Sequence, residues 1–143
     1  MPTTYSAVVG GNARMKAVWT ESLTDTHLNV SVWFYLQMVN GGSSKGTWGA
    51  SWWGYWNGSN NVPRNIGANG ESLVVSGSYS IPRTTVDQST YFAASAGSYW
   101  GTPGHHFNLT IPGKPTVPGT PFPVSGTPSE VTSTSMKYQF SGT

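Results

Sequence analysis

The sequence has no cysteine among its 143 residues. Neither a disulfide framework nor a thiolate metal site is therefore available to it. Charge is also scarce, because Asp, Glu, Lys and Arg together make up 8% of the chain, whereas about 25% is usual for a globular domain. A chain poor in charge can still be disordered, but 13% aromatic residues argue for a packed core.

Two kinds of segment are missing as well. No apolar stretch has the length of a membrane span, and residues 1–11 lack the basic and apolar regions of a secretory signal peptide. The seven Lys and Arg residues are scattered and not clustered, which argues against nucleic-acid binding. We therefore expect no membrane insertion, no nucleic-acid partner and no export through a signal peptide.

The clearest pattern in the chain runs from His27 to Val39, where apolar and polar side chains alternate for a dozen residues. Alternation with a period of two is typical of a strand that has one buried face. Shorter segments of the same kind occur at 13–20, 47–56, 72–81, 90–96 and 105–111. Gly, Asn and Pro predict breaks at 40–43, 57–60, 69–70 and 81–83, and the polar residues at 21–26 predict a hairpin connection. The expected buried face of the long strand consists of Leu28, Val30, Val32, Phe34, Leu36 and Met38.

These segments together predict an all-β fold. Short strands separated by turn residues at intervals of about ten residues are typical of a β-sandwich or barrel. Nothing in the sequence predicts a helix longer than one turn. We therefore predict an antiparallel β-sandwich domain at residues 1–112, with the strand at 27–39 in a central position.

The composition changes after Pro112. Six prolines between 112 and 128 predict a stiff, extended linker at 113–130. A new alternating run, Met136 to Phe140, then predicts the first strand of a second β module at 131–143. Because one strand cannot form a module by itself, we expect the second module to be incomplete and the parent chain to continue beyond Thr143.

Two stretches resemble known families. Residues 115–121 (PTVPGTP) and 131–142 (VTSTSMKYQFSG) resemble the opening of a fibronectin type III-like module. Residues 3–14 (TTYSAVVGGNAR) resemble the start of minor tail or tail-fibre proteins of long-tailed phages (siphoviruses) that infect actinobacteria. In those phage proteins a β-rich N-terminal domain often precedes fibronectin-like modules.

The resemblance implies a structural component of a phage virion, located in the tail and acting in tail assembly and attachment to the host surface. Its partners would be other tail proteins, further copies of itself and a host cell-surface glycan. A virion protein is made in the host cytoplasm and released by lysis, which agrees with the lack of a visible signal peptide. The alternative is a carbohydrate-binding module of an extracellular glycosidase, because fibronectin-like modules occur in those enzymes too.

The sequence offers little for catalysis. Its five carboxylates, Glu21, Asp25, Glu71, Asp87 and Glu130, lie in or near expected turns, whereas glycoside hydrolysis needs two carboxylates across a cleft. His105 and His106 are neighbours on an expected strand and so point to opposite faces. They are not expected to chelate one metal together. We therefore expect no enzyme, no catalytic residue, no metal and no cofactor.

The most informative segment for binding is 47–58 (TWGASWWGYWNG). On a continuous strand, Trp48, Trp52 and Trp56 share one face, and Trp53 and Tyr55 share the other. Three interpretations stay open for this set: packing in the core, an interface with another protein, or stacking against the sugar rings of a glycan. The candidate contact residues are Trp48, Trp52, Trp53, Tyr55 and Trp56.

Overall fold

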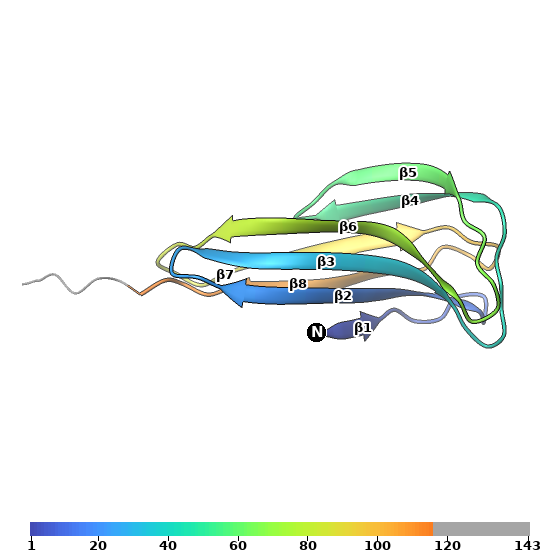
Figure 1. Ribbon diagram of the computed structural model, residues 1–143, viewed down its shortest axis with the longest axis horizontal. Helices are drawn as coiled ribbons and strands as arrows, with labels where there is room; N and C mark the ends of the chain where they lie inside the picture. The colour runs from blue at the N-terminus through green and yellow to red at the C-terminus, as the bar shows by residue number, and fades with distance from the viewer. Residues whose placement is uncertain (116–143) are drawn as a thin grey trace, which may run out of the picture. The chain divides into compact units, whose positions relative to one another are not determined.

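The computed structural model describes residues 1–115, and it contains eight strands and no helix in that range (Figure 1). The expected module start at 131–143 and most of the expected linker at 113–130 lie outside the described residues. The strands are β1 (Thr3–Tyr5), β2 (Ala13–Leu23), β3 (His27–Met38), β4 (Thr47–Gly54), β5 (Gly58–Pro63), β6 (Glu71–Pro82), β7 (Gln88–Ala96) and β8 (Gly104–Ile111).

The strands form two four-stranded sheets that pack face to face as a sandwich. The first sheet has the order β1-β2-β3-β6 and the second the order β5-β4-β7-β8. Every strand pair in the two sheets is antiparallel. The predicted all-β antiparallel sandwich is therefore confirmed.

Strand β3 lies between β2 and β6, as predicted for the strand with the longest alternation. Its six apolar side chains from Leu28 to Met38 are all buried, with exposed fractions of 2% or less. They face the second sheet because successive side chains of a strand point to opposite sides. Burial of each such side chain contributes about 1.5–3 kcal/mol to folding.

An aromatic cluster fills the space between the sheets. Phe34 of the first sheet lies 6.0 Å from Phe107 and 5.7 Å from Trp56, measured between ring centroids. Phe92 of β7 lies 5.2 Å from Trp56 in an edge-to-face arrangement and 5.5 Å from Phe107. Aromatic pairs at such distances add stabilisation beyond the area that they bury.

The structure differs from the sequence prediction in two short strands. Residues 57–60 (NGSN) were expected to be a break, but β5 begins at Gly58 and pairs with β4. Residues 3–5 form β1 on the edge of the first sheet. Both strands lie at sheet edges, where side chains are exposed on more than one side, so their sequences carry no clear apolar alternation.

The predicted breaks at 40–43 and 69–70 lie outside the strands, whereas β6 continues to Pro82 through most of the predicted break at 81–83. Asn40 and Asn69 adopt left-handed backbone angles, with φ of 56° and 57°, a conformation that asparagine tolerates better than most residues. Strand β2 continues to Leu23, so the connection between β2 and β3 is shorter than the predicted connection at 21–26. Thr24 closes it, since its amide donates to the His27 carbonyl oxygen at 2.9 Å.

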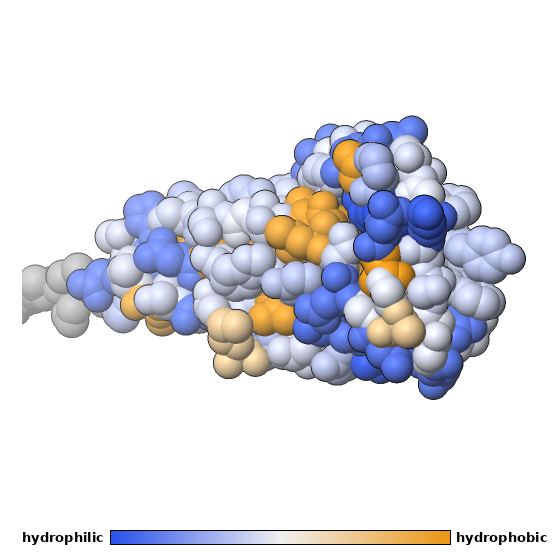
Figure 2. All heavy atoms as spheres, turned by 45° about the vertical axis from the view of Figure 1, so that its right-hand side comes forward, coloured by the Kyte–Doolittle hydropathy of each residue, from blue (hydrophilic) through white to orange (hydrophobic). Residues whose placement is uncertain are grey.

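Polar side chains cover part of the outer face of the first sheet. Lys16 Nζ lies 2.8 Å from Glu71 Oε1, and Gln37 Nε2 donates to the same oxygen at 3.1 Å. Arg14 Nε donates to Gln37 Oε1 at 2.6 Å. In Figure 2 several apolar patches are visible on this face, most of them bordered by side chains of intermediate hydropathy. This network joins β2, β3 and β6 at one end of the outer face of the first sheet.

Candidate functional site

The structure divides the five predicted contact residues between core and surface. Trp56 is buried, with 5% of its surface exposed. Trp48 and Trp52 are half-buried, and Trp52 packs against the core cluster. Trp53 and Tyr55 are exposed by 43% and 39%. The core interpretation therefore describes Trp56, whereas Trp53 and Tyr55 are available for contact.

The expected sharing of one face by Trp53 and Tyr55 is wrong. Strand β4 ends at Gly54, whose φ of +95° lies in the region that favours glycine. This residue interrupts the alternation. Tyr55 consequently turns toward the first sheet and packs edge-on against Tyr79 of β6, with ring centroids 5.3 Å apart. Trp53 alone of the five faces outward from the second sheet, beside β7.

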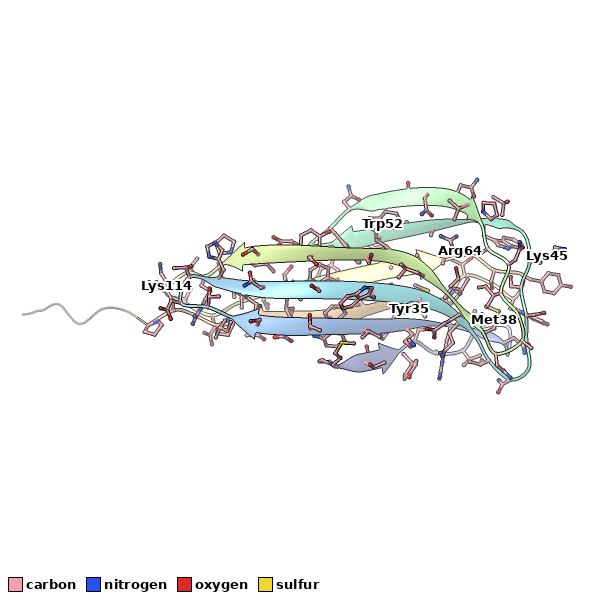
Figure 3. All side chains as sticks on the ribbon, in the orientation of Figure 1. Tyr35, Met38, Lys45, Trp52, Arg64 and Lys114 are labelled. Carbon is pink, nitrogen blue, oxygen red and sulfur yellow. The ribbon has the colours of Figure 1, made fainter. Side chains whose placement is uncertain are left out.

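Arg64 follows β5 directly and lies beside the hairpin that carries these tryptophans (Figure 3). The residue is buried, and its Nη1 donates to the Trp48 carbonyl oxygen at 3.1 Å. Its Nη2 donates to Asn60 Oδ1 at 3.1 Å. Burial lowers the pKa of the Arg64 guanidinium. Because Arg64 holds one residue of β4 and one of β5, it stabilises the pairing of the two strands.

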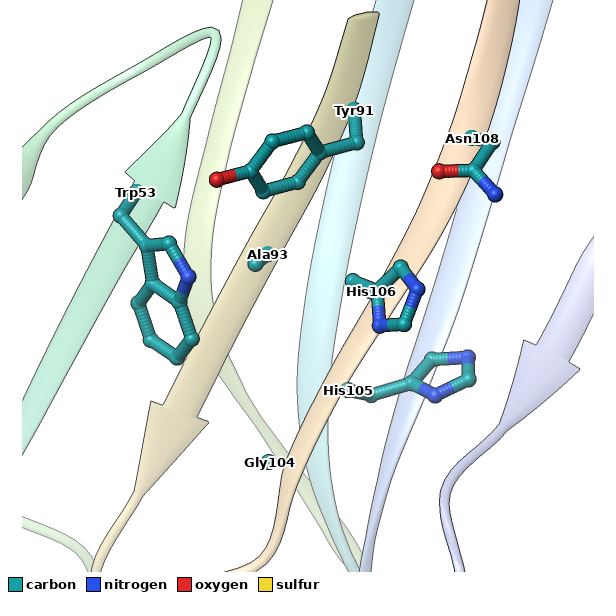
Figure 4. Close-up of a pocket in the computed structure, with 7 residues that line it drawn as sticks. All are labelled: Trp53, Tyr91, Ala93, Gly104, His105, His106 and Asn108. Atoms are coloured by element: carbon teal, nitrogen blue, oxygen red, sulfur yellow. The ribbon is translucent and has the colours of Figure 1, made fainter.

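Trp53 borders a hollow on the outer face of the second sheet, with a volume of about 330 Å³. We call it the aromatic hollow. In Figure 4 the Tyr91 ring points from β7 toward Trp53 on β4, and Ala93 lies between them. Strand β8 supplies the opposite side. The hollow is lined by Trp53, Tyr91, Ala93, Gly104, His105, His106 and Asn108.

Strand register brings these residues together from three strands. Trp53 pairs with Ala93 across β4 and β7, and Ala93 pairs with His106 across β7 and β8. Tyr91 lies two residues before Ala93, so both point to the same side, and it pairs with Asn108. Side chains in direct register on one face lie about 4.5–5.5 Å apart at Cβ. Ala93 has a small side chain, which leaves the centre low, and Gly104, in register with Ser95, leaves one end of the hollow open.

The core supports the aromatic hollow from beneath. Trp56 Nε1 donates to the Ala93 carbonyl oxygen at 3.1 Å, and this hydrogen bond is buried. The Tyr55 amide donates to the Tyr91 carbonyl oxygen at 2.8 Å. Tyr91 also contacts His106 edge-on, with ring centroids 6.3 Å apart. The backbone under the two exposed rings is therefore held in place before any ligand binds.

His105 ties the edges of the two sheets together. Its Nε2 lies 2.8 Å from Thr4 Oγ1, and the two residues belong to the edge strands β8 and β1. Burial, and secondarily the neighbouring His106, lower the pKa of His105. Within residues 1–115, no group of three or more His, Asp or Glu side chains is placed to hold a metal ion.

The carboxylates of the described region lie elsewhere. Glu21 accepts a hydrogen bond from Trp19 Nε1, Glu71 pairs with Lys16, and Asp87 accepts from the Gly113 amide. None of them, and no other Asp or Glu, lines the aromatic hollow. The hollow therefore offers ring stacking and hydrogen bonding to a bound molecule.

The described part of the chain contains no helix long and apolar enough to cross a membrane.

Sequence reasoning missed Tyr91 and Asn108 and considered His106 only as a metal ligand. The sequence shows only that Tyr91 and Phe92 are neighbours on a predicted strand and so point to opposite faces; the structure shows that Phe92 is buried and Tyr91 exposed. The register that places it beside Trp53 joins strands that are distant in sequence. Strand register between segments so far apart cannot be predicted from a single sequence.

Comparison of the chain with protein-family models, with curated proteins and with solved structures found no match.

Proposed function

We propose that this chain is a structural component of a phage tail that also contacts the host surface, and that it does so through the aromatic hollow. The observation that carries the proposal is the pair of exposed rings, Trp53 and Tyr91, on either side of Ala93. Both rings are more than 40% exposed. Exposed aromatic side chains gathered at one place generally mark a binding site.

The resemblance of residues 3–14 supports the assignment to a tail. This stretch includes β1 and the turn into β2, and β1 is joined to the second sheet by the contact between Thr4 and His105. Residues 3–14, which carry the resemblance, thus belong to the folded domain itself. The proposed partners are other tail proteins, further copies of this chain and a glycan of the host surface, and the proposed location is the virion tail.

Additional exposed apolar side chains support assembly with other proteins. Tyr5 and Val8 lie in or just after β1, and Leu73 lies on β6. Each is exposed by more than 40%. Tyrosine and apolar residues of this kind are common in the centre of protein interfaces. They are separate from the aromatic hollow, so assembly and attachment can use different surfaces.

The aromatic hollow equally favours a second candidate, a carbohydrate-binding module of an extracellular glycosidase. Both candidates bind glycans without a reaction at this site. They differ in what the chain is attached to: a tail in the first, and a catalytic domain in the second.

The test is the location of the protein. Antibodies against residues 1–115 should label the tails of purified virions of the encoding phage in immunogold electron microscopy. The purified chain should also sediment with actinobacterial cell walls. Absence of the chain from virions, together with its covalent continuation into a glycosidase domain, would favour the second candidate. No binding to cell walls would remove the attachment role.

A further inference from the structure

The chemistry of the aromatic hollow restricts which ligand it can take. None of its seven lining residues is Asp, Glu, Lys or Arg. Its polar side-chain groups are the Tyr91 hydroxyl, the Asn108 amide and the His106 imidazole, whereas the His105 ring points away to Thr4 of β1. A carboxylate, phosphate or sulfate that enters this site loses water without meeting an opposite formal charge, which is costly. The hollow therefore favours a neutral ligand.

The arrangement of the rings favours a flat ligand with an apolar face. The face of an aromatic ring is electron-rich, so it attracts the slightly positive C–H groups that line one face of a pyranose. Trp53 and Tyr91 present such rings on adjacent strands, with the small Ala93 between them. Trp53 is in register with Ala93, so a sugar ring against Trp53 would lie above a small side chain.

The opposite side of the hollow supplies hydrogen bonds. Asn108 offers two donors and one acceptor oxygen, and a neutral imidazole offers one donor and one acceptor. His106 pairs with Ala93, and Asn108 pairs with Tyr91, so both side chains lie across from the rings. A ligand that fits must be apolar on one face and carry hydroxyl groups at its edge. Pockets for small ligands commonly combine apolar walls with a few such polar groups.

The volume of the aromatic hollow limits the size of the ligand. A volume of about 330 Å³ is at the small end for ligand sites, which range from about 300 to 1,000 Å³. Strand β4 ends at Gly54, directly after Trp53, so no further residue of β4 extends the aromatic wall. The hollow therefore suits one sugar ring, with the remainder of a polysaccharide outside.

We infer that the aromatic hollow binds one neutral pyranose ring of a polysaccharide, with the C–H face of the sugar against Trp53 and its hydroxyl groups toward His106 and Asn108. This inference rests on the proposed function for the source of the glycan, but the site itself can be tested without it. Trp53 and Tyr91 provide stacking, and His106 and Asn108 provide orientation.

The experiment is a titration of the full 143-residue chain, labelled with ¹⁵N, followed by NMR at pH 7.5. The probes are the methyl glycosides of glucose, galactose and mannose, and methyl glucuronide. The glucuronide differs from the glucoside only by a carboxylate at C6, so it isolates the effect of charge. The indole N–H signal of Trp53 is assigned from Trp53→Phe.

At least one neutral glycoside should shift the Trp53 signal saturably. Where the glucoside binds, the glucuronide should bind at least tenfold more weakly. Trp53→Ala should reduce binding by tenfold or more, measured on the remaining signals of the hollow. Gly104→Leu, which places a side chain in one end of the hollow but keeps both rings, should do the same. Tyr99→Ala alters an exposed ring outside the hollow and should leave binding unchanged.

Three results would overturn the inference: no neutral glycoside shifts the Trp53 signal, the glucuronide binds as tightly as any neutral glycoside, or binding survives Trp53→Ala. Cell-wall sedimentation separates this outcome from failure of the proposed function. If the chain sediments with cell walls and Trp53→Ala does not reduce glycoside binding, the host-attachment role is supported and the sugar site is contradicted. If a neutral glycoside binds at Trp53 but the chain does not sediment with cell walls, the sugar site is supported and the host-attachment role is contradicted.

Discussion

The rings of Trp19 and Phe107 stack face to face across the sandwich, with centroids 3.8 Å apart and planes inclined by 8°. Trp19 belongs to β2 and Phe107 to β8, so this pair joins the two sheets directly. Both side chains are buried. Trp19 Nε1 is satisfied by Glu21 Oε2 at 3.0 Å, which allows an indole to be buried without an unpaired donor.

Replacement of either ring should therefore destabilise the domain strongly. We expect Trp19→Ala and Phe107→Ala each to lower the free energy of unfolding by about 3–5 kcal/mol. In a double-mutant cycle the two changes should be non-additive by about 0.5–1.5 kcal/mol, the coupling typical of aromatic pairs. Urea unfolding followed by circular dichroism measures both quantities. Strictly additive losses would show that the stacking itself contributes nothing.

Trp53 and Trp56 should behave in opposite ways although they are three residues apart. Trp56→Ala removes a buried ring and should cost about 3–5 kcal/mol of unfolding free energy. Trp53→Ala alters an exposed ring and should cost about 1 kcal/mol or less. The same Trp53 variant should weaken attachment to cell walls by about 2 kcal/mol or more, as loss of an interface anchor does. A Trp53 variant that fails to fold would contradict the assignment of this residue to contact.

The sequence predicted most of the fold because apolar alternation marks a strand buried on one side. It predicted all six buried side chains of β3 correctly for that reason. It predicted the aromatic segment less well, because a strict period of two holds only while the backbone stays extended. Gly54 interrupts this alternation, and the sequence does not indicate whether a glycine at this position continues the strand or ends it. Tyr91 and Asn108 were missed because strand register depends on the whole sheet.

Gly54 itself is open to a direct test. A Cβ at this position would lie 2.4 Å from the Tyr91 carbonyl oxygen, on a backbone with φ of +95°. Gly54→Ala should therefore lower the free energy of unfolding by about 2–4 kcal/mol. Gly41→Ala is the matched control, since Gly41 also has a positive φ, of +79°, but nothing within 4 Å of its Cβ position. Gly41→Ala should lower the free energy of unfolding by only about 1 kcal/mol. Equal losses for both would mean that the contact with Tyr91 adds nothing.

Stability should depend on pH through His105. Burial and His106 hold the pKa of His105 below its ordinary value of 6.5, so the unfolded chain binds a proton more readily than the folded one. Stability is therefore greatest above pH 6.5 and falls as the pH drops below that value toward the lower pKa of the folded state. His105→Gln cannot take up this proton.

The comparison to make is the free energy of unfolding at pH 8 and pH 5.5, for the unmodified chain and for His105→Gln. The unmodified chain should lose more stability between the two values than the variant does. His106→Gln removes the secondary cause of the lowered pKa of His105 but keeps its burial and its contact with Thr4, so this variant should retain most of the pH dependence. Identical pH dependence in the unmodified chain and in His105→Gln would show that other groups are responsible.

The place of β6 in the first sheet has a consequence for the speed of folding. Strand β6 pairs with β3, yet β4 and β5, which belong to the other sheet, lie between them in the sequence. The β2–β3 and β4–β5 hairpins can form from neighbouring residues, whereas β6 must find β3 after a long loop has closed. Loop closure of this kind costs entropy before any contact repays it. The transition state for folding should therefore contain β3 already joined to β6, and refolding should take milliseconds to seconds.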